Sequence, residues 1–445
     1  MWIFDCQVRG GHETATERSG ALRPTDEKRG PILSQQSQIG NGHPPRAPYD
    51  LSPVILAGFV LTGTVTTLLG PILPVISSKW LLSDLGAGDL FLAQFLGSTF
   101  GTIISGFLIV RLGFDRLLAV GFGVMALGVA ALGLTPWPTC IVAVTAFGVA
   151  LGLTIPAINL FVSENNPQRP AAALSILNAA WSIGAVVSPP LVALLIVPGA
   201  RIGRLLGLAA MLAIVAFFIP ILKAHRAPAS LEETPSGRDV MADSSRGRFD
   251  LRVWLRAQGF VFAALFFLYV GIENSVGGWV ATYAHRLTGQ PGARWELAPS
   301  LFWGTLILGR ILVPTMLRYL SEARLVTAGL LVTTLGVTAL LISNSLMSVF
   351  LSVSLAGLGL SSVFPTTIAL LTQCFGRAAS PAGAPMFGFA ALGGACLPWL
   401  VGFLSSQFAS IRVGLWVPLL AILAMLAVNG LLPTADERAD KSSGE

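Results

Sequence analysis

One apolar stretch of the chain, LYVGIENSVGGWVATYA, contains a glutamate, Glu273. An ionisable group in hydrocarbon is costly, so such a residue is a candidate for function. Within seven residues Glu273 is joined by an amide at Asn274, a glycine pair at Gly277-Gly278 and an indole at Trp279. These groups suit the binding of a polar ligand in lipid: a carboxyl, an amide, an aromatic face, and a glycine backbone that a ligand can approach closely.

Amides and indoles recur in other apolar segments, where they could line the same site. An amide both donates and accepts hydrogen bonds, and an indole offers a flat face with one donor, which suits a neutral polyol or sugar. Each amide could equally hold two membrane helices together. An organic anion would require arginines, and Arg310 is the one arginine deep in an apolar segment. The predicted substrate-binding residues are Gln94, Asn159, Asn178, Trp181, Glu273, Asn274, Trp279 and Trp303.

Three roles are open for Glu273. It could take up and release a proton, accept hydrogen bonds from a bound solute, or be a structural carboxyl beside a helix break at Gly277-Gly278. Arg310 is not expected to pair with it. Counted from the predicted cytoplasmic helix ends at 1.5 Å per residue, the two residues differ in depth by ~10 Å.

The composition indicates a membrane protein. Hydrophobic residues make up 53% of the 445, and charged residues only 11%, against about 25% in soluble domains. The mean hydropathy is +0.74. The ten-residue alternation of a transmembrane barrel is absent, so the spans are predicted to be helices.

Several classes of protein are excluded by what the sequence contains. The four cysteines form no CxxC pair, and the four histidines fall in tails or loops, so no metal or other cofactor is expected. The basic charge lies in loops and tails, which makes it a signal of topology rather than of nucleic-acid binding. No HExxH or GxSxG motif and no nucleotide-binding domain is present, so we do not expect an enzyme.

Twelve apolar segments of about twenty residues or more can each cross ~30 Å of hydrocarbon. The predicted spans are 51–77, 87–110, 117–135, 137–163, 171–197, 202–222, 259–284, 297–317, 325–343, 346–374, 382–405 and 413–432. The predicted organisation is a disordered cytoplasmic tail (1–49), a six-helix bundle (50–222), a cytoplasmic linker (223–256), a second six-helix bundle (257–432) and a cytoplasmic tail (433–445).

Basic residues orient these spans. Six Lys and Arg fall in the loops of one side and Arg310 falls inside a span, which leaves 21 of the 28 on the side that holds the tails and the linker. That side is therefore predicted to be cytoplasmic, in a plasma membrane or a bacterial inner membrane. The two halves also repeat one another, since Gly184 precedes Pro189 by the same five residues that separate Gly393 from Pro398. Parallel repeats of this kind place a solute between the halves.

Two motifs resemble a known family. The residues from Gly106 to Arg116, GFLIVRLGFDR, resemble the G-x-L-x-D-R-x-G-R-[RK] loop motif of the major facilitator superfamily, with Val110 in place of its aspartate and Asp115 in place of a basic residue. The segment YVGIENSVGGW around Glu273 is similar to the YVG-x-E-x-x-x-GGW pattern of fucose-permease-like sugar transporters. The resemblance implies an all-α integral membrane fold of twelve transmembrane helices in two six-helix bundles.

The resemblance also suggests roles for single residues. In the fucose-permease relatives proton coupling is associated with acidic residues in the first and fourth spans, whereas the corresponding spans here offer threonines and Asn159, which leaves Glu273 as the candidate proton-coupling residue. The glycine pair of the seventh span marks where that helix is expected to bend. The predicted gating residues are Gly106, Arg111, Gly113, Gly277, Gly278 and Arg310.

The predicted function is secondary active transport of a small polar solute, specifically a sugar, by alternating access. Symport with protons through Glu273 is the hypothesis, and uniport stays open. An efflux pump or a transporter of a drug, amino acid or organic anion is the alternative, which the partial motif from Gly184 to Pro190 supports. A membrane-embedded enzyme or receptor is the disfavoured alternative of another class. The expected partners are the solute, the lipid bilayer and protons, with no nucleic acid, and the protein is expected to be a monomer.

Overall fold

The computed structural model describes residues 51–166, 170–195, 201–224, 257–289, 294–375 and 379–430, and every regular element in these ranges is a helix. The predicted tails and nearly all of the predicted linker lie outside the described residues. The first half contains α1 (Pro53–Thr66), α2 (Leu69–Trp80), α3 (Asp84–Leu134), α4 (Cys140–Asn165), α5 (Pro170–Leu195) and α6 (Arg201–Ala224). The second half contains α9 (Ala257–Thr288), α10 (Leu297–Met316), α11 (Glu322–Ile342), α12 (Leu346–Leu360), α13 (Val363–Phe375), α14 (Ala379–Gln407), α15 (Ile411–Gly414) and α16 (Trp416–Asn429).

Each of the twelve predicted spans has a helical counterpart. Nine helices in the described residues are long and apolar enough to cross a membrane, and α1 and α2 together form a tenth, bent span. One of the nine, α3, holds two predicted spans, and α6 supplies a shorter apolar stretch, Leu205–Ile219. The prediction of an all-helical membrane protein is confirmed.

The 51 residues of α3 fold back on themselves at Gly113. A straight helix of that length would extend ~77 Å, more than twice the hydrocarbon thickness. Gly113 has φ 74° and ψ 166°, a backbone conformation that is essentially restricted to glycine. The chain therefore reverses direction within one turn, where the sequence had indicated a loop between the second and third spans.

The first span is broken between α1 and α2, and the two pieces meet at 45°. Proline has no N–H, so Pro71 cannot donate to the carbonyl of Thr67 and Pro74 cannot donate to the carbonyl of Gly70. The break at Thr67 and Leu68 lies directly before these two prolines. The prolines thus explain why α2 takes a direction of its own.

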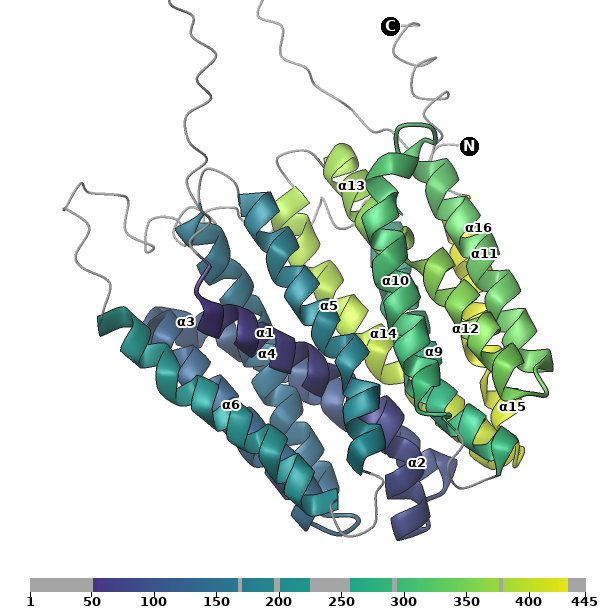
Figure 1. The fold of residues 1–445 in the computed structure, drawn as a ribbon. Coiled ribbons are helices and arrows are strands. Elements are labelled where there is room, and N and C mark those ends of the chain that lie inside the picture. The colour runs from purple at the N-terminus through teal and green to yellow at the C-terminus, as the bar shows by residue number, and fades with distance from the viewer. Residues whose placement is uncertain are drawn as a thin grey trace, which may run out of the picture.

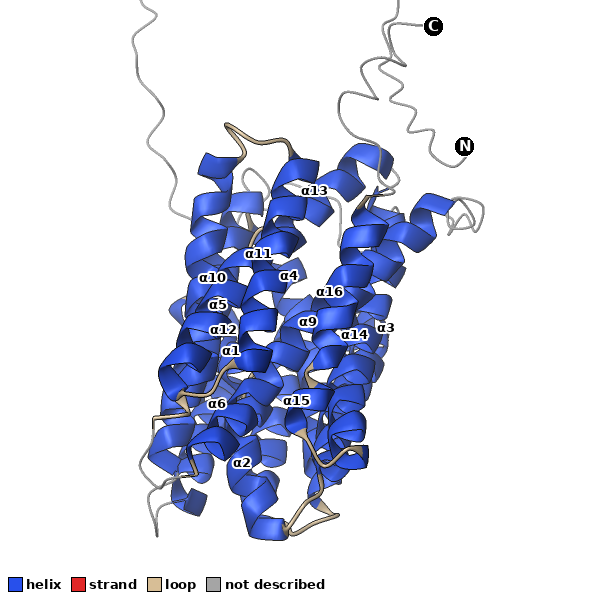
Figure 2. Cartoon of the chain, turned by 90° about the vertical axis from the view of Figure 1, so that its right-hand side faces the viewer, coloured by secondary structure: helices blue, strands red, loops and turns tan. Residues whose placement is uncertain are grey.

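The helices of the two halves lie side by side. In Figure 1 α1, α3, α4 and α6 are on the left and α9 to α12 and α16 on the right, and α5 lies between them. Figure 2 shows that the helices run close to parallel, with most loops at their two ends. We call these ends the Gly113 end and the Asp84 end. Contacts between the halves join α14 with α3, α9 with α2 and α10 with α5. The division into two six-helix bundles stays a prediction.

Glycines bring α1 and α5 into backbone contact. A Cβ atom on Gly63 would overlap the carbonyl oxygen of Trp181, and a Cβ atom on Gly184 would overlap that of Val60. The hydroxyl of Thr64 reaches the Gly184 carbonyl at 3.3 Å. Small residues that permit such close approach are the usual means of joining helices in lipid, where no hydrophobic effect drives them together.

The turn at Gly113 generates a test by substitution. Gly113→Ala should destabilise the protein by about 1–3 kcal/mol, because alanine is strained at this backbone conformation. Gly123→Ala is the matched control, because both glycines have open space where a Cβ would be placed and Gly123 is not at positive φ. The control should be neutral or stabilising by up to about 1 kcal/mol. Melting temperatures of the purified variants distinguish the two, and equal melting temperatures would contradict the proposed strain.

Candidate functional site

Glu273 lies at the middle of α9 and is held by two side chains. The hydroxyl of Tyr269, one turn earlier in α9, donates to its Oε1 at 2.9 Å. Nη2 of Arg310, on α10, lies 3.2 Å from the same oxygen and 3.1 Å from the Tyr269 hydroxyl. The Glu273 side chain is 12% exposed and that of Arg310 is 29% exposed. A carboxylate, a guanidinium and a phenol thus form one closed network.

The expectation that Arg310 does not pair with Glu273 is wrong. It assumed that the Gly113-end termini of α9 and α10 are level, but α9 has 32 residues and α10 only 20. Counted from the Asp84 end, Glu273 lies ~22 Å and Arg310 ~20 Å along their helices. The two residues are therefore at similar depth, and the gating role assigned to Arg310 is untested.

The shell around this pair is aromatic. The ring of Tyr269 packs on Phe364 of α13 with centroids 5.1 Å apart. Phe266 packs edge-on against the Phe364 ring, with centroids 5.7 Å apart. Nε of Arg310 is buried and has no hydrogen-bond partner. An ion pair in such surroundings is strongly held, because removing either partner leaves an uncompensated charge. The unused Nε donor is the group available to another acceptor.

Two predicted substrate residues from opposite halves meet near the pair. Trp181 of α5 and Trp303 of α10 form an edge-to-face contact with ring centroids 5.9 Å apart. A Cβ on Gly277 would lie 3.1 Å from the Trp303 ring, so this indole lies one helical turn from Glu273 toward the Asp84 end. Trp181 is partly buried and Trp303 is 4% exposed. The indole pair therefore joins α5 to α10 on the Asp84-end side of Glu273.

Trp279 does not present its indole to a ligand in this structure. The side chain is fully buried, and its N–H donates to the carbonyl of Pro398 on α14 at 2.9 Å. Its ring also packs against Phe91 of α3 at 5.9 Å. Its single donor is already used, so the prediction that it binds substrate does not fit this conformation. Trp279 instead joins α9 to α14 and α3.

The predicted amides divide into two kinds. Asn159, Asn178 and Asn274 each donate Nδ2 to the carbonyl four residues earlier at 2.8 Å. Asn178 is exposed, and the other two are partly buried. Gln94 differs, because it is 2% exposed and donates across to the Thr66 carbonyl at 2.9 Å. The three asparagines leave their amide oxygens for a ligand, whereas the amide of Gln94 joins two helices.

The glycine pair of α9 is a contact and not a helix break. The helix is continuous through Gly277 and Gly278. A Cβ on Gly70 of α2 would lie 2.9 Å from the Gly277 carbonyl oxygen, and a Cβ on Gly278 would lie 2.8 Å from the Phe91 ring. The predicted bend is therefore absent here. These glycines instead let the two halves touch.

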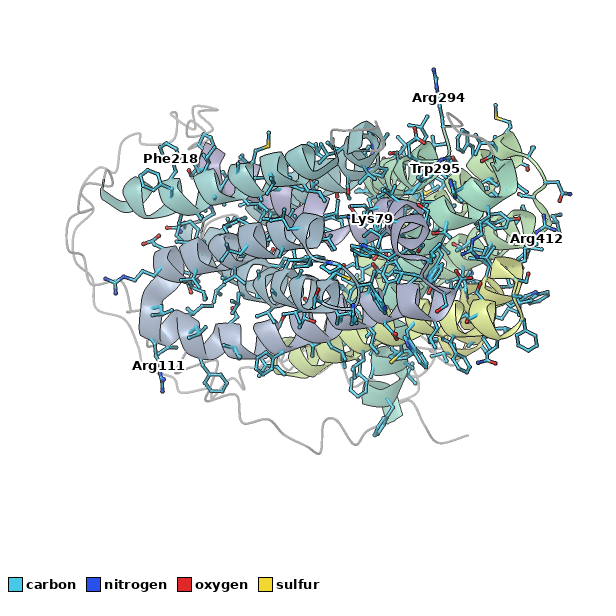
Figure 3. All side chains as sticks on the ribbon, turned by 90° about the horizontal axis from the view of Figure 1, so that it is seen from below. Lys79, Arg111, Phe218, Arg294, Trp295 and Arg412 are labelled. Atoms are coloured by element: carbon cyan, nitrogen blue, oxygen red, sulfur yellow. The ribbon has the colours of Figure 1, made fainter. Side chains whose placement is uncertain are left out.

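Polar contacts at the Asp84 end close the same boundary. Both carboxylate oxygens of Asp84, at the start of α3, accept hydrogen bonds from Arg286 of α9, one of them at 2.8 Å, and Ser405 of α14 also donates to Asp84. The indole of Trp399 donates to Asp89 at 3.0 Å. In Figure 3 Lys79 lies near the middle of the molecule, with Arg294 and Arg412 on the side of the second half.

Sequence reasoning missed these closing residues. Arg286 was counted only among the basic residues of the loops, and Asp84 was not considered, although Ser83, which accepts from the Gly86 N–H at 3.2 Å, marks Asp84 as the first residue of a helix. A carboxylate in a first turn and a cation in a last turn are both favoured by the helix dipole. That signal places them at facing helix ends but does not reveal that the two ends meet.

The residues of the loop motif lie at the Gly113 end. Gly106 and Arg111 are exposed, and a Cβ on Gly106 would meet no atom within 4 Å. The Arg111 side chain projects away from the helices in Figure 3. No contact described in the structure connects these residues with the second half, and their predicted gating role stays a prediction. Within the described ranges there is no group of three or more His, Cys, Asp or Glu that could hold a metal ion.

The comparison with family models decides the identity of the fold. The model of the major facilitator superfamily matches residues 55–384. The chain belongs to this superfamily. As a member it is a membrane transporter of solutes and not an enzyme, and the family resemblance of its two motifs is confirmed.

Related transporters share about a quarter of their residues with this superfamily member. An MFS-type transporter of Yersinia pestis is 24% identical over 373 residues, which are 83% of this chain and 92% of the relative. The glucose/galactose transporter of Brucella abortus is 26% identical over 351 residues, 74% of this chain and 80% of the relative. The human sodium-dependent glucose transporter 1 is 21% identical over 413 residues, 83% and 76% of the two chains.

Solved structures share the fold. A bacterial homologue of the human lysosomal transporter Spinster, inward-facing and occupied, has a TM-score of 0.69 at 14% identity and covers 85% of this chain and 95% of its own. The E. coli fucose:proton symporter has a TM-score of 0.57 at 18% identity and covers 86% and 98%. The superfamily fold of this transporter thus rests on its sequence match and on its architecture.

The ion pair predicts a specific pattern of stability. Arg310→Met should lower the free energy of unfolding by a few kcal/mol, less than the about 3–5 kcal/mol of a fully buried pair, because Arg310 is 29% exposed. Adding Glu273→Gln to Arg310→Met should recover part of this loss, since no unpaired charge remains. Thermal unfolding of both single variants and the double variant measures the coupling. Additive losses would show that the two side chains do not interact.

The glycine contact between the halves predicts a transport defect. Gly278→Leu should lower the initial rate of uptake at least about tenfold, equivalent to ~1.4 kcal/mol, because the side chain would overlap Phe91 and prevent closure at the Asp84 end. Gly207→Leu is the matched control, since a Cβ there meets nothing within 4 Å. Unimpaired uptake by a normally inserted Gly278→Leu protein would refute the closure role.

Proposed function

We propose that this protein transports a small neutral polar solute of the sugar class by alternating access, with Glu273 and Arg310 at the centre of the solute site. The observation that carries the proposal is the buried Glu273–Arg310 pair at mid-length of α9, with Tyr269 bonded to both. Charged groups at this depth cost free energy, so their presence indicates a functional role. The partly buried Trp181, backed by Trp303, offers an indole face on which a sugar ring could stack.

Relatives support the sugar class. The Brucella abortus and human proteins described above are both named glucose transporters, and the E. coli structure is of a fucose:proton symporter. The partly buried amides add neutral hydrogen-bonding groups. Asn159 and Asn274 each keep an amide oxygen for the hydroxyls of a solute.

Coupling to protons follows from the same network. A proton on Glu273 would neutralise it and weaken its bond to Arg310, which releases guanidinium donors for the oxygens of a solute. Return of the proton to water would restore the pair and expel the solute. The solute and the proton are thus bound together and released together, which is symport. A uniporter would use the pair only to hold the solute.

An organic anion is the second candidate solute. The observation in its favour is Nε of Arg310, a buried donor without a partner. A carboxylate on the solute would replace Glu273 as the partner of Arg310, since guanidinium groups bind carboxylates through two parallel hydrogen bonds. Among the described residues, Arg310 is the one arginine that lies away from both ends of a predicted span.

The protein is further proposed to be a monomer in a plasma membrane or a bacterial inner membrane. Arg111, Arg116, Arg318 and Arg324 all lie at the Gly113 end of the described helices. The excess of positive charge in short loops on the cytoplasmic side supports placing this end, and with it both termini, in the cytoplasm.

Transport by reconstituted protein tests the proposal. Proteoliposomes should accumulate labelled glucose or galactose against a gradient when the outside is acid, with a matching alkalinisation outside. Glu273→Gln should lose this accumulation yet retain exchange of labelled for unlabelled solute, because only the proton step is removed. Glu296→Gln, at the start of α10 with no capping bond from its side chain, is the matched control.

Each failure has its own meaning. Uptake of lactate but of no sugar would favour the organic anion. Sugar uptake without a change of pH, together with normal accumulation by Glu273→Gln, would refute the coupling role of Glu273 and leave uniport.

A further inference from the structure

Two adjacent prolines in α5 free backbone carbonyls from the helical pattern of hydrogen bonds. In a continuous helix the carbonyls of Ala185 and Val186 accept from the N–H groups of residues 189 and 190. Both of these residues are proline, which has no N–H, although α5 continues through them. The sequence motif from Gly184 to Pro190 therefore has a local chemical effect, because it leaves acceptors inside a membrane helix that other donors must satisfy.

The freed carbonyl of Val186 accepts a hydrogen bond from the other half of the protein. The donor is the hydroxyl of Ser300 on α10, whose Oγ lies 3.2 Å from the carbonyl oxygen. Hydroxyls in membrane helices commonly donate to the carbonyl four residues earlier in their own helix, as those of Thr62 and Thr305 do. Ser300 instead donates across the boundary, where a carbonyl without a helical donor is available.

The internal repeat of the sequence shows that this arrangement is specific to α5. The residue equivalent to Pro190 is Trp399 of α14, because each directly follows the proline of the repeated Gly-to-Pro step. Trp399 has a backbone N–H, so α14 frees no carbonyl through this residue. Its indole N–H donates instead to Asp89 of the first half at 3.0 Å. The same repeat position thus supports a bond between the halves twice, once through a freed carbonyl and once through a side chain.

The Ser300–Val186 bond lies between the indole pair and the Asp84 end. On α10, which begins at that end, Ser300 comes three residues before Trp303. On α5, which ends there, Val186 comes five residues after Trp181. At 1.5 Å per residue the two bonded residues are ~5–8 Å closer to the Asp84 end than the indoles of their own helices. Because α5 and α10 belong to different halves, the bond requires that this end be closed.

We propose that Pro190 and Ser300 are positioning residues of the transport cycle: Pro190 frees the Val186 carbonyl, and Ser300 binds this carbonyl to hold α5 against α10 while the Asp84 end is closed. When the halves separate there, water solvates both the hydroxyl and the carbonyl. The bond therefore biases the equilibrium between the two states without locking it. The bond from Thr64 to the Gly184 carbonyl differs, because α1 and α5 belong to the same half and stay together.

Hydrogen exchange of the purified full chain, without any solute, tests this role. Ser300→Ala should speed exchange in the Asp84-end turns of α5 and α10 and slow it at their Gly113 ends, because the population moves toward the state open at the Asp84 end. The rates should change about two- to tenfold, the effect of one hydrogen bond. Alanine is the better helix former, so a purely local effect of the substitution would slow exchange at the Asp84 end instead.

Three further variants separate the proposed role from a structural one. Pro190→Ala should act in the same direction as Ser300→Ala, because its restored N–H competes for the Val186 carbonyl, and the double variant should show little further shift. Ser300→Thr keeps the hydroxyl and should match the wild-type protein. Thr64→Val is the matched control, because it removes a hydroxyl bond to α5 within one half. It should lower the melting temperature without the opposite changes in exchange at the two ends.

Three outcomes would overturn the proposal: unchanged exchange in Ser300→Ala, faster exchange at the Asp84 end without slower exchange at the Gly113 end, or additive shifts in the double variant. If Pro190→Ala does not fold, the comparison of Ser300→Ala with Ser300→Thr decides. The inference rests on the proposed alternating access but not on the identity of the solute. Uptake of labelled glucose is measured separately, so the sugar proposal can fail while this one stands.

Discussion

The pairing of Glu273 with Arg310 constrains the structure around it. Two opposite charges in a medium of low dielectric constant must remain in contact, or each must find another partner. The pair therefore fixes the register of α9 against α10 and of both against Phe364 of α13, which covers Tyr269. Any event that changes the charge of Glu273 changes the packing of three helices together.

The boundary between the halves follows a different principle. At the Asp84 end it combines backbone contacts at glycines, such as Gly70 with Gly277, polar bonds at helix ends, such as Asp84 with Arg286, and aromatic contacts, such as Phe91 with Trp279. The first kind of contact requires the absence of side chains and the second requires charge.

Sequence reasoning was most successful where the signal is local. Apolar length located a helical counterpart for every predicted span, and a lone carboxyl in an apolar run singled out Glu273, which lies in a network with Arg310 and Tyr269. It failed where the answer depends on how two helices are placed relative to one another. Arg310 was judged too far away because helix ends were assumed to be level, and Trp279 was assigned to a ligand because the Pro398 carbonyl that accepts its N–H is 119 residues distant. Asp84 was overlooked for the same reason, since its partner Arg286 is 202 residues away.

The glycine contacts between the halves also bear on the speed of conformational exchange. Interdigitated side chains must be withdrawn from one another before two helices can rotate, and each lost atomic contact costs ~0.1–0.2 kcal/mol. The surfaces at Gly70 and Gly277 meet through backbone and carry no such ridges, so rotation there forfeits few contacts at the transition state. The barrier to opening then lies in the side-chain contacts across the boundary: the aromatic contact of Phe91 with Trp279, and polar bonds such as Asp84–Arg286, which water can replace one at a time as the end opens. A boundary of this kind favours rapid turnover over long residence in either state.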